Sequence, residues 1–86
     1  MKVYEMLKNY RLSKNMKQKD IAKATHTSVT YVCKLETRAY LPSPKYLIAF
    51  CNRTGMDYRL IANSVIDERV NNLREILKQR YFNSGL

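Results

Sequence analysis

The chain has 86 residues, of which 45% are hydrophobic and 27% charged, and its formal net charge is +9. A chain of this length can bury one small core, which leaves little room for a deep substrate cleft. It has only two glycines and two prolines, too few for an all-β fold rich in tight turns, and no apolar run approaches the length of a membrane span. We therefore expect a single small helical domain with no membrane association.

The positive charge is concentrated in the first three quarters of the chain. Residues 1–64 hold twelve Lys and Arg against four Asp and Glu, whereas residues 65–86 hold four against three. This asymmetry indicates that the basic part of the chain binds a polyanion and that the nearly neutral C-terminal part has a different role. The alternative, that the charge only keeps the protein soluble, stays open at this point.

Cysteine and histidine usage argues against a metal site and against disulfides. Cys33 and Cys51 lie 18 positions apart, no C-x-x-C occurs, and His26 is the only histidine. The first residues, M-K-V-Y-E-M-L-K, interrupt their apolar positions with charges, unlike a signal peptide. We expect a cytoplasmic protein without metal or cofactor, and we interpret His26 as a turn residue.

The first two predicted helices cover residues 2–14 and 18–24. Each carries apolar residues at helical spacing, which are Val3, Leu7 and Tyr10 in the first and Ile21 and Ala22 in the second. Asn15 can adopt the left-handed conformation that ends a helix, and the polar segment Thr25-His26-Thr27 separates the second helix from the next. The first 27 residues therefore predict two helices and a short turn.

A third helix is predicted from Val29 to about Thr37 and a fourth from Pro44 to about Thr54. Ser28 and Ser43 are suitable N-caps, and proline is favoured in a first helical turn. Val32 and Leu35 should face inward in the third helix, and the inner side of the fourth should be lined by Leu47, Ile48, Phe50 and Cys51.

The C-terminal part predicts a short fifth helix capped by Asp57 and a separate sixth helix beginning at Ser64. In the sixth helix an apolar stripe steps by 4, 3 and 4 residues, the spacing of a coiled-coil seam, through Ile66, Val70, Leu73 and Leu77. This stripe is either a dimer seam or a surface that packs on the chain's own domain. The prediction is thus an all-α fold with domain 1–63 and a C-terminal extension 64–86.

The second and third helices, joined by a three-residue turn, have the layout of a helix-turn-helix. The outward side of the third helix carries Val29, Thr30, Tyr31, Cys33 and Lys34, which is unusual for a helix that needs only solubility. A B-DNA major groove about 12 Å wide admits a helix. Lys34 can donate to guanine, Thr30 can donate or accept, and the Val29 methyl groups can touch a thymine methyl. Ser28 and the free amides beside it can bind a phosphate.

Four segments in register over residues 7–61 resemble the Cro/CI-type, Xre-like helix-turn-helix domain of phage repressors. They are R-L-S-K-N-M-K-Q-K-D-I-A-K, T-S-V-T-Y-V-C-K-L-E, L-P-S-P-K-Y-L-I and G-M-D-Y-R-L-I. The resemblance implies a five-helix, lambda-repressor-like domain, to which the predicted sixth helix is an addition.

The resemblance also implies residue roles. Gln18 would bond a phosphate and brace the first recognition residue, while Arg11 and Glu36 would form a structural ion pair. Base contacts would come from Val29, Thr30, Tyr31 and Lys34, and backbone contacts from Lys17, Gln18, Ser28, Arg38 and Tyr40.

Three positions depart from the family pattern. His26 replaces the usual turn glycine, which implies a strained left-handed residue. Lys17 replaces a Ser or Thr cap and exchanges the cap for a phosphate contact. Val29 stands where some members carry a base-reading Gln or Arg, which favours methyl contact there.

Together these features predict a bacterial or phage DNA-binding regulator, nucleoid-associated when bound. It would be a repressor that binds an inverted repeat as a homodimer, with half-sites about 34 Å apart. An antitoxin of a toxin–antitoxin pair is the alternative, in which the C-terminal helix would hold a protein partner such as a toxin; an antirepressor is another possible partner. The sequence shows neither paired metal-binding carboxylates nor a nucleophile–base set, so we do not expect an enzyme.

Overall fold

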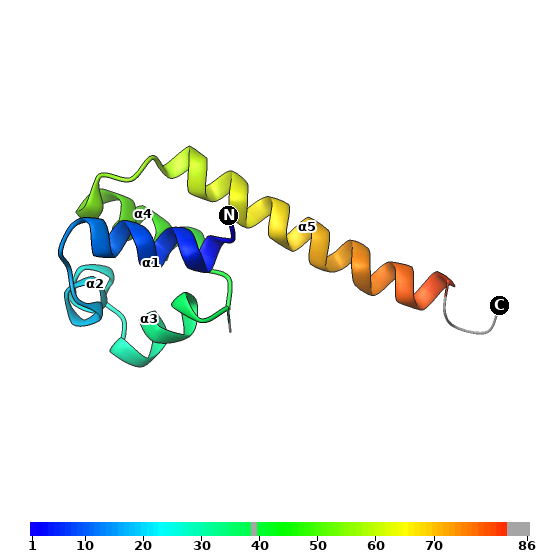
Figure 1. The fold of residues 1–86 in the computed structure, drawn as a ribbon, viewed down its shortest axis with the longest axis horizontal. Helices are drawn as coiled ribbons and strands as arrows, with labels where there is room; N and C mark the ends of the chain where they lie inside the picture. The colour runs from blue at the N-terminus through cyan, green and yellow to red at the C-terminus, as the bar shows by residue number, and fades with distance from the viewer. Residues whose placement is uncertain (39, 83–86) are drawn as a thin grey trace.

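The computed structural model describes residues 1–38 and 40–82, which form five helices without a strand. The helices are α1 (Val3–Ser13), α2 (Gln18–Thr25), α3 (Val29–Glu36), α4 (Pro44–Thr54) and α5 (Tyr58–Phe82). The first four helices and the start of α5 form a compact body, and the rest of α5 projects away from it (Figure 1). The predicted all-α class is confirmed.

Side-chain caps begin three of the helices. The Oγ atoms of Ser28 and Ser43 accept hydrogen bonds from the backbone N–H groups three residues later, at 3.0 and 3.2 Å. Asp57 Oδ1 accepts from the backbone N–H of Arg59 at 3.0 Å. Each bond satisfies an amide that has no partner inside its helix, so these residues determine where α3, α4 and α5 begin.

Left-handed residues end α1, α2 and α4. Asn15 and His26 both have φ of 56°, and Gly55 has φ of 78°. At the end of α2 the N–H of Thr27 donates to the Ala22 carbonyl at 2.9 Å, which closes a Schellman turn around His26. His26 thus takes the place of the usual glycine and redirects the chain from α2 into α3.

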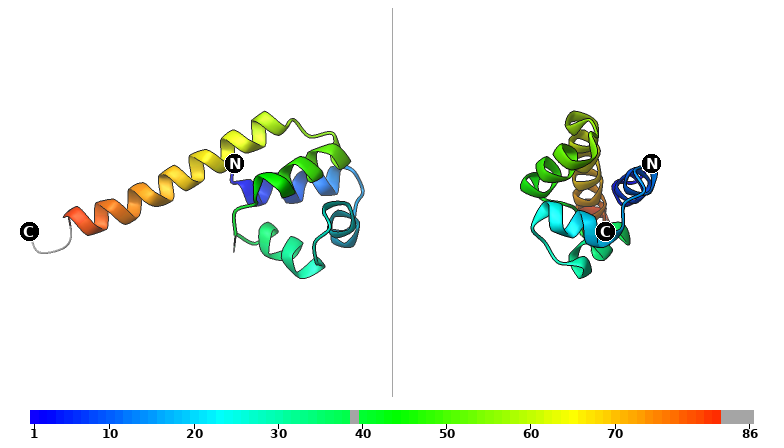
Figure 2. Two further views of the ribbon diagram at one scale, coloured as in Figure 1. Left: turned by 180° about the vertical axis from the view of Figure 1, so that it is seen from behind. Right: turned by 90° about the vertical axis from the view of Figure 1, so that its left-hand side faces the viewer.

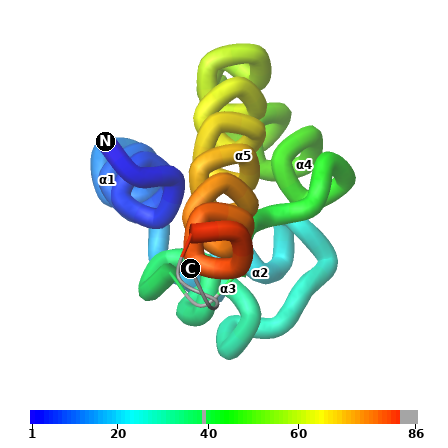
Figure 3. The backbone as a smooth tube through the Cα atoms, turned by 90° about the vertical axis from the view of Figure 1, so that its right-hand side faces the viewer, coloured from blue at the N-terminus to red at the C-terminus, as the bar shows by residue number. Residues whose placement is uncertain are grey.

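One apolar core joins all five helices. Its fully buried members include Leu7 of α1, Ile21 of α2, Leu35 of α3, Phe50 of α4 and Ile61 of α5. Viewed along α5, the body shows α1 on one side of this helix and α4 on the other (Figure 3), and α2 and α3 lie at the end of the body away from α5 (Figure 2). The prediction for Ile48 was wrong, because its side chain is 50% exposed and lies outside the buried stripe of α4.

The predicted division between a fifth and a sixth helix was also wrong. A single helix, α5, runs from Tyr58 to Phe82, and no glycine or proline interrupts it. Ser64 is not an N-cap; its Oγ donates to the Leu60 carbonyl at 3.2 Å, a bond that a helix interior accommodates. The predicted boundary between residues 63 and 64 therefore falls within a continuous helix.

The first part of α5 is anchored to the body. Ile61 and Val65 are buried, and the Glu68 carboxylate accepts a hydrogen bond from the N–H of Val3 at 2.7 Å. The apolar stripe farther along is exposed, at 56% for Ile66, 49% for Val70, 56% for Leu73 and 38% for Leu77. Within a single chain, this stripe does not pack on the domain. In the described part of the chain, no helix is both long and apolar enough to cross a membrane.

Candidate nucleic-acid interface

Helix α3 divides cleanly into an inward and an outward face. Val32 and Leu35 have no exposed surface, whereas Val29, Thr30, Cys33 and Lys34 are all exposed. At 100° per residue, the four exposed positions fall within one continuous arc of the helix surface. The arrangement presents a methyl surface, a hydroxyl, a thiol and a cation side by side. Methyl groups, hydroxyls and cations are groups that can contact base edges.

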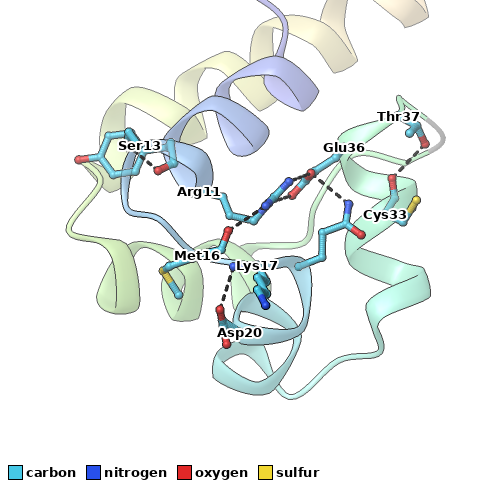
Figure 4. A network of polar contacts seen from close by, with 10 residues as sticks. Arg11, Ser13, Met16, Lys17, Asp20, Cys33, Glu36 and Thr37 are labelled. Carbon is cyan, nitrogen blue, oxygen red and sulfur yellow. Dashed lines mark hydrogen bonds and ion pairs between the residues drawn. The ribbon is translucent and has the colours of Figure 1, made fainter.

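A buried ion pair holds α3 against α1. Arg11 Nε donates to Glu36 Oε2 at 2.8 Å, and Arg11 Nη2 donates to Glu36 Oε1 at 2.9 Å (Figure 4). The remaining terminal nitrogen of Arg11 donates to the Met16 carbonyl at 2.8 Å. Hydrogen bonding to Glu36 raises the pKa of Arg11, so the guanidinium stays charged. This two-bond geometry restricts both the position and the rotation of the last turn of α3.

Gln18 belongs to the same network. Its side-chain amide donates to Glu36 Oε1 at 3.2 Å, so it links the first residue of α2 to the last residue of α3. The family resemblance implied that this side chain would bond a phosphate and brace the first recognition residue, and both roles stay predictions beside the contact with Glu36. The observed contact means that Gln18 supports the angle between the two helices.

Four aromatic rings continue from α3 into the core. Tyr31 stacks on Tyr40 at 6.0 Å between centroids and meets Tyr46 edge-on at 5.6 Å, and Tyr46 stacks on Phe50 at 6.1 Å. Burial raises the pKa of Tyr46, which keeps its hydroxyl neutral. Because Tyr31 is half-buried by these rings, it is less available for base contact than its four exposed neighbours on α3.

Lys34 and Tyr40 interact at the edge of this aromatic cluster. Lys34 Nζ lies 3.3 Å from the Tyr40 hydroxyl and 5.3 Å from the centre of its ring. Tyr40 is 47% exposed, so the pair remains accessible to a ligand. The contact with Tyr40 therefore restricts the ammonium group of Lys34, which its flexible four-carbon side chain would otherwise leave free to move.

A family model described as helix-turn-helix matches residues 7–61, well over half of the chain. The chain belongs to the Cro/CI-type, Xre-like helix-turn-helix family. Searches among curated proteins and among solved structures found no match. This family consists of DNA-binding transcription regulators, so the ligand of the helix-turn-helix protein is double-stranded DNA.

The remaining predicted contact residues of this helix-turn-helix protein lie at helix starts and in the loop after α3. Lys17 and Ser28 are exposed N-caps of α2 and α3. Lys17 has no capping side chain, and its N–H donates to Asp20 Oδ2 at 2.8 Å, which is the half of a capping box that satisfies the amide of the N-cap itself. Arg38 has φ of 72°, and its guanidinium lies 5.0 Å from the centre of the Tyr4 ring.

Beside this loop is a basic hollow that sequence reasoning did not identify. Its volume is about 560 Å³, and its lining includes the three cations Lys2, Arg38 and Arg69, the carboxylate of Glu68, and Tyr4 and Tyr40. Three cations from three separate parts of the chain meet there, so periodicity within one helix could not reveal it. The excess of positive charge over residues 1–64 covers Lys2 and Arg38 but not Arg69.

The two cysteines of the helix-turn-helix protein provide a probe of the recognition face. We expect a thiol reagent to modify Cys33 readily in the folded protein and Cys51 only after unfolding. Cys33 is exposed on α3, whereas Cys51 is buried, and burial raises the pKa of its thiol and so lowers its thiolate fraction.

Mass spectrometry after a brief iodoacetamide pulse would measure both rates. Bound operator DNA should protect Cys33, because the DNA would cover that side of α3. An unchanged Cys33 rate at saturating DNA would place the DNA elsewhere.

Proposed function

We propose that this protein is a repressor that binds a specific inverted repeat in double-stranded DNA as a homodimer. The observation that carries this proposal is the exposed arc of α3, supported from behind by the buried pair of Arg11 and Glu36. A reading helix must present donors, acceptors and methyl groups on a rigid support, and this arc meets both requirements. Repression would follow from exclusion of polymerase at the bound site.

Base contacts are assigned to the exposed arc. Lys34 would donate to guanine O6 or N7, Thr30 would bond a base edge, and Val29 would touch a thymine methyl group. Tyr31 would contribute only through its hydroxyl, because its ring is already packed against Tyr40 and Tyr46.

Backbone contacts are assigned to the helix starts and the loop after α3. Lys17, Gln18, Ser28, Arg38 and Tyr40 would meet phosphates, and Arg69 would extend this surface across the basic hollow. These contacts would determine the position of the protein on the duplex and carry most of the salt dependence of binding.

The exposed stripe of α5 is the proposed dimer seam. Ile66, Val70, Leu73 and Leu77 lie outside the core of the single chain, and a small DNA-binding module needs a second copy to reach useful affinity. Residues 1–63 would then be the DNA-binding part and residues 64–86 the dimerisation part, although both share α5.

The same exposed stripe also favours a second candidate, an antitoxin that regulates its own operon. A toxin would then cover the apolar face of α5 in place of a second copy. Co-purification of a partner encoded beside the gene would favour this candidate, and a pure homodimer would favour the first.

A titration of labelled duplex from upstream of the gene would test the function. We expect binding that survives excess random DNA and weakens as salt is raised, because base contacts give specificity and phosphate contacts give affinity. A footprint should show two protected segments about 34 Å apart, one DNA turn. Equal displacement by random DNA would mean that the basic surface binds polyanions without reading sequence.

A further inference from the structure

Helix α5 has two apolar faces, and only one is used within the single chain. Ile61, Val65 and Glu68 point toward the body, where the first two are buried and the third bonds Val3. At 100° per residue, the stripe from Ile66 to Leu77 lies roughly 140° around the helix from these residues. A helix that keeps one apolar face in water across three turns is expected to bury it against a partner.

The spacing of the stripe fits a second copy of the same helix. Steps of 4, 3 and 4 residues alternate between the a and d positions of a heptad, the pattern that allows two helices to interdigitate. The order of these steps, 4, 3 and 4, is the same from either end of the stripe. A copy running the opposite way therefore places its Leu77 on Ile66 and its Leu73 on Val70.

Charges beside the stripe distinguish the two directions. In a parallel, in-register pair, Arg69 adjoins the partner's Arg74, and the two cations repel each other. Because the pair is symmetric, the same repulsion occurs twice in each dimer. In the antiparallel pair, Asp67 adjoins the partner's Arg74 instead, and symmetry repeats this attraction. These flanking positions determine the orientation of paired helices.

An exposed apolar residue outside the stripe, Leu60, favours the same direction. Leu60 is 57% exposed and Tyr81 is 68% exposed, although they lie near opposite ends of α5. In the antiparallel register, Leu60 adjoins the partner's Tyr81 at both ends of the seam. In the parallel register, Tyr81 adjoins the partner's Ile76, but the position facing Leu60 precedes α5, which begins only at Tyr58. Leu60 therefore distinguishes the two registers.

We propose that two copies of this chain pair along α5 in antiparallel orientation, with Ile66 against the partner's Leu77 and Asp67 beside the partner's Arg74. This inference rests on the homodimer of the proposed function and specifies its geometry. The two helix-turn-helix bodies then lie toward opposite ends of the seam.

Disulfide trapping tests the orientation directly. In full-length Cys33→Ser protein, Ile66→Cys and Leu77→Cys would be prepared separately, one of them with an affinity tag. Mild oxidation of the mixture should form a disulfide between the two variants. Either variant oxidised by itself should form none. Cross-links within either single variant would overturn the proposal, and so would the absence of a mixed cross-link, whether the chain sediments as a monomer or as a dimer.

Charge exchange provides a second test that leaves the seam intact. Arg74→Asp should weaken the dimer by about tenfold in sedimentation equilibrium, because two attractive pairs become repulsive. The double variant Asp67→Arg with Arg74→Asp should restore most of the affinity. A parallel dimer would respond in the opposite direction, since Arg74→Asp would relieve its repulsion with Arg69.

Duplex titration of the unsubstituted protein, which retains Cys33 on the exposed arc of α3, separates this inference from the proposed function. A mixed cross-link without sequence-specific binding would support the seam and contradict the repressor. Specific binding by a chain that shows no mixed cross-link would support the repressor and contradict the seam. Far-UV circular dichroism of each variant would verify that the helices are retained.

Discussion

Arg11→Met is expected to lower the free energy of unfolding by about 3–5 kcal/mol, the usual cost of removing one partner from a buried ion pair. The side chains of Arg11 and Glu36 are only 9% and 4% exposed, so the variant would leave a carboxylate inside the protein without its counter-charge. Gln18 would remain as a donor to that carboxylate, but a neutral amide cannot compensate a full charge. Urea unfolding followed by circular dichroism would measure the decrease.

Two further variants would identify the cause. Arg11→Met with Glu36→Leu removes both charges and should recover most of the stability, since an apolar pair can replace a buried ion pair at little cost. Glu75→Gln breaks the exposed pair of Glu75 and Lys78, which are 3.8 Å apart, and should change stability by less than about 0.5 kcal/mol. A double variant as unstable as Arg11→Met would mean that packing, and not charge, dominates.

Periodicity and capping predicted most of the fold because both are local. The residues that begin α3 and α4 and those that end α1 and α2 act through bonds to neighbours within five positions. Ser64 shows where local reasoning fails. A serine hydroxyl can cap a helix or bond back to the carbonyl four residues earlier, and the choice depends on whether the preceding turn is already helical.

The candidate site was predicted less completely, because several of its features depend on contacts across the chain. The half-burial of Tyr31 depends on Tyr40 and Tyr46, which approach it from the loop and from α4. The partner of Gln18 lies 18 residues away, and the basic hollow joins Lys2, Arg38 and Arg69. The pairing of Arg11 with Glu36 was implied by family resemblance, and helix periodicity alone does not indicate it.

Lys34→Glu is expected to reduce affinity for the specific operator by on the order of 100-fold or more, since one good base contact contributes about 1–3 kcal/mol and the reversal adds repulsion. The side chain is exposed on the recognition arc, and its Nζ lies 3.3 Å from the Tyr40 hydroxyl. A carboxylate there could only accept hydrogen bonds, whereas guanine O6 and N7 require a donor. Its negative charge would also be repelled by nearby phosphates. Stability should change little, because the position contributes nothing to the core.

A matched control is Lys8→Glu, which makes the same change in net charge at an exposed position of α1 outside the α2–α3 pair. It should weaken operator and random DNA alike, and only severalfold, through the general field of the protein. Tyr40→Phe removes a hydroxyl that is assigned to a phosphate contact, so it should weaken operator and random-DNA binding by a similar factor.

The decisive quantity is the ratio of operator affinity to random-DNA affinity for each variant. If Lys34 meets a phosphate, its substitution would lower both affinities together and reduce the salt slope by about one. If Lys34 meets a base, its substitution would bring the ratio toward one, while random-DNA binding would fall only as far as in Lys8→Glu. A ratio near one would therefore place the lysine in the major groove, and an unchanged ratio would place it on the backbone beside Arg38 and Tyr40.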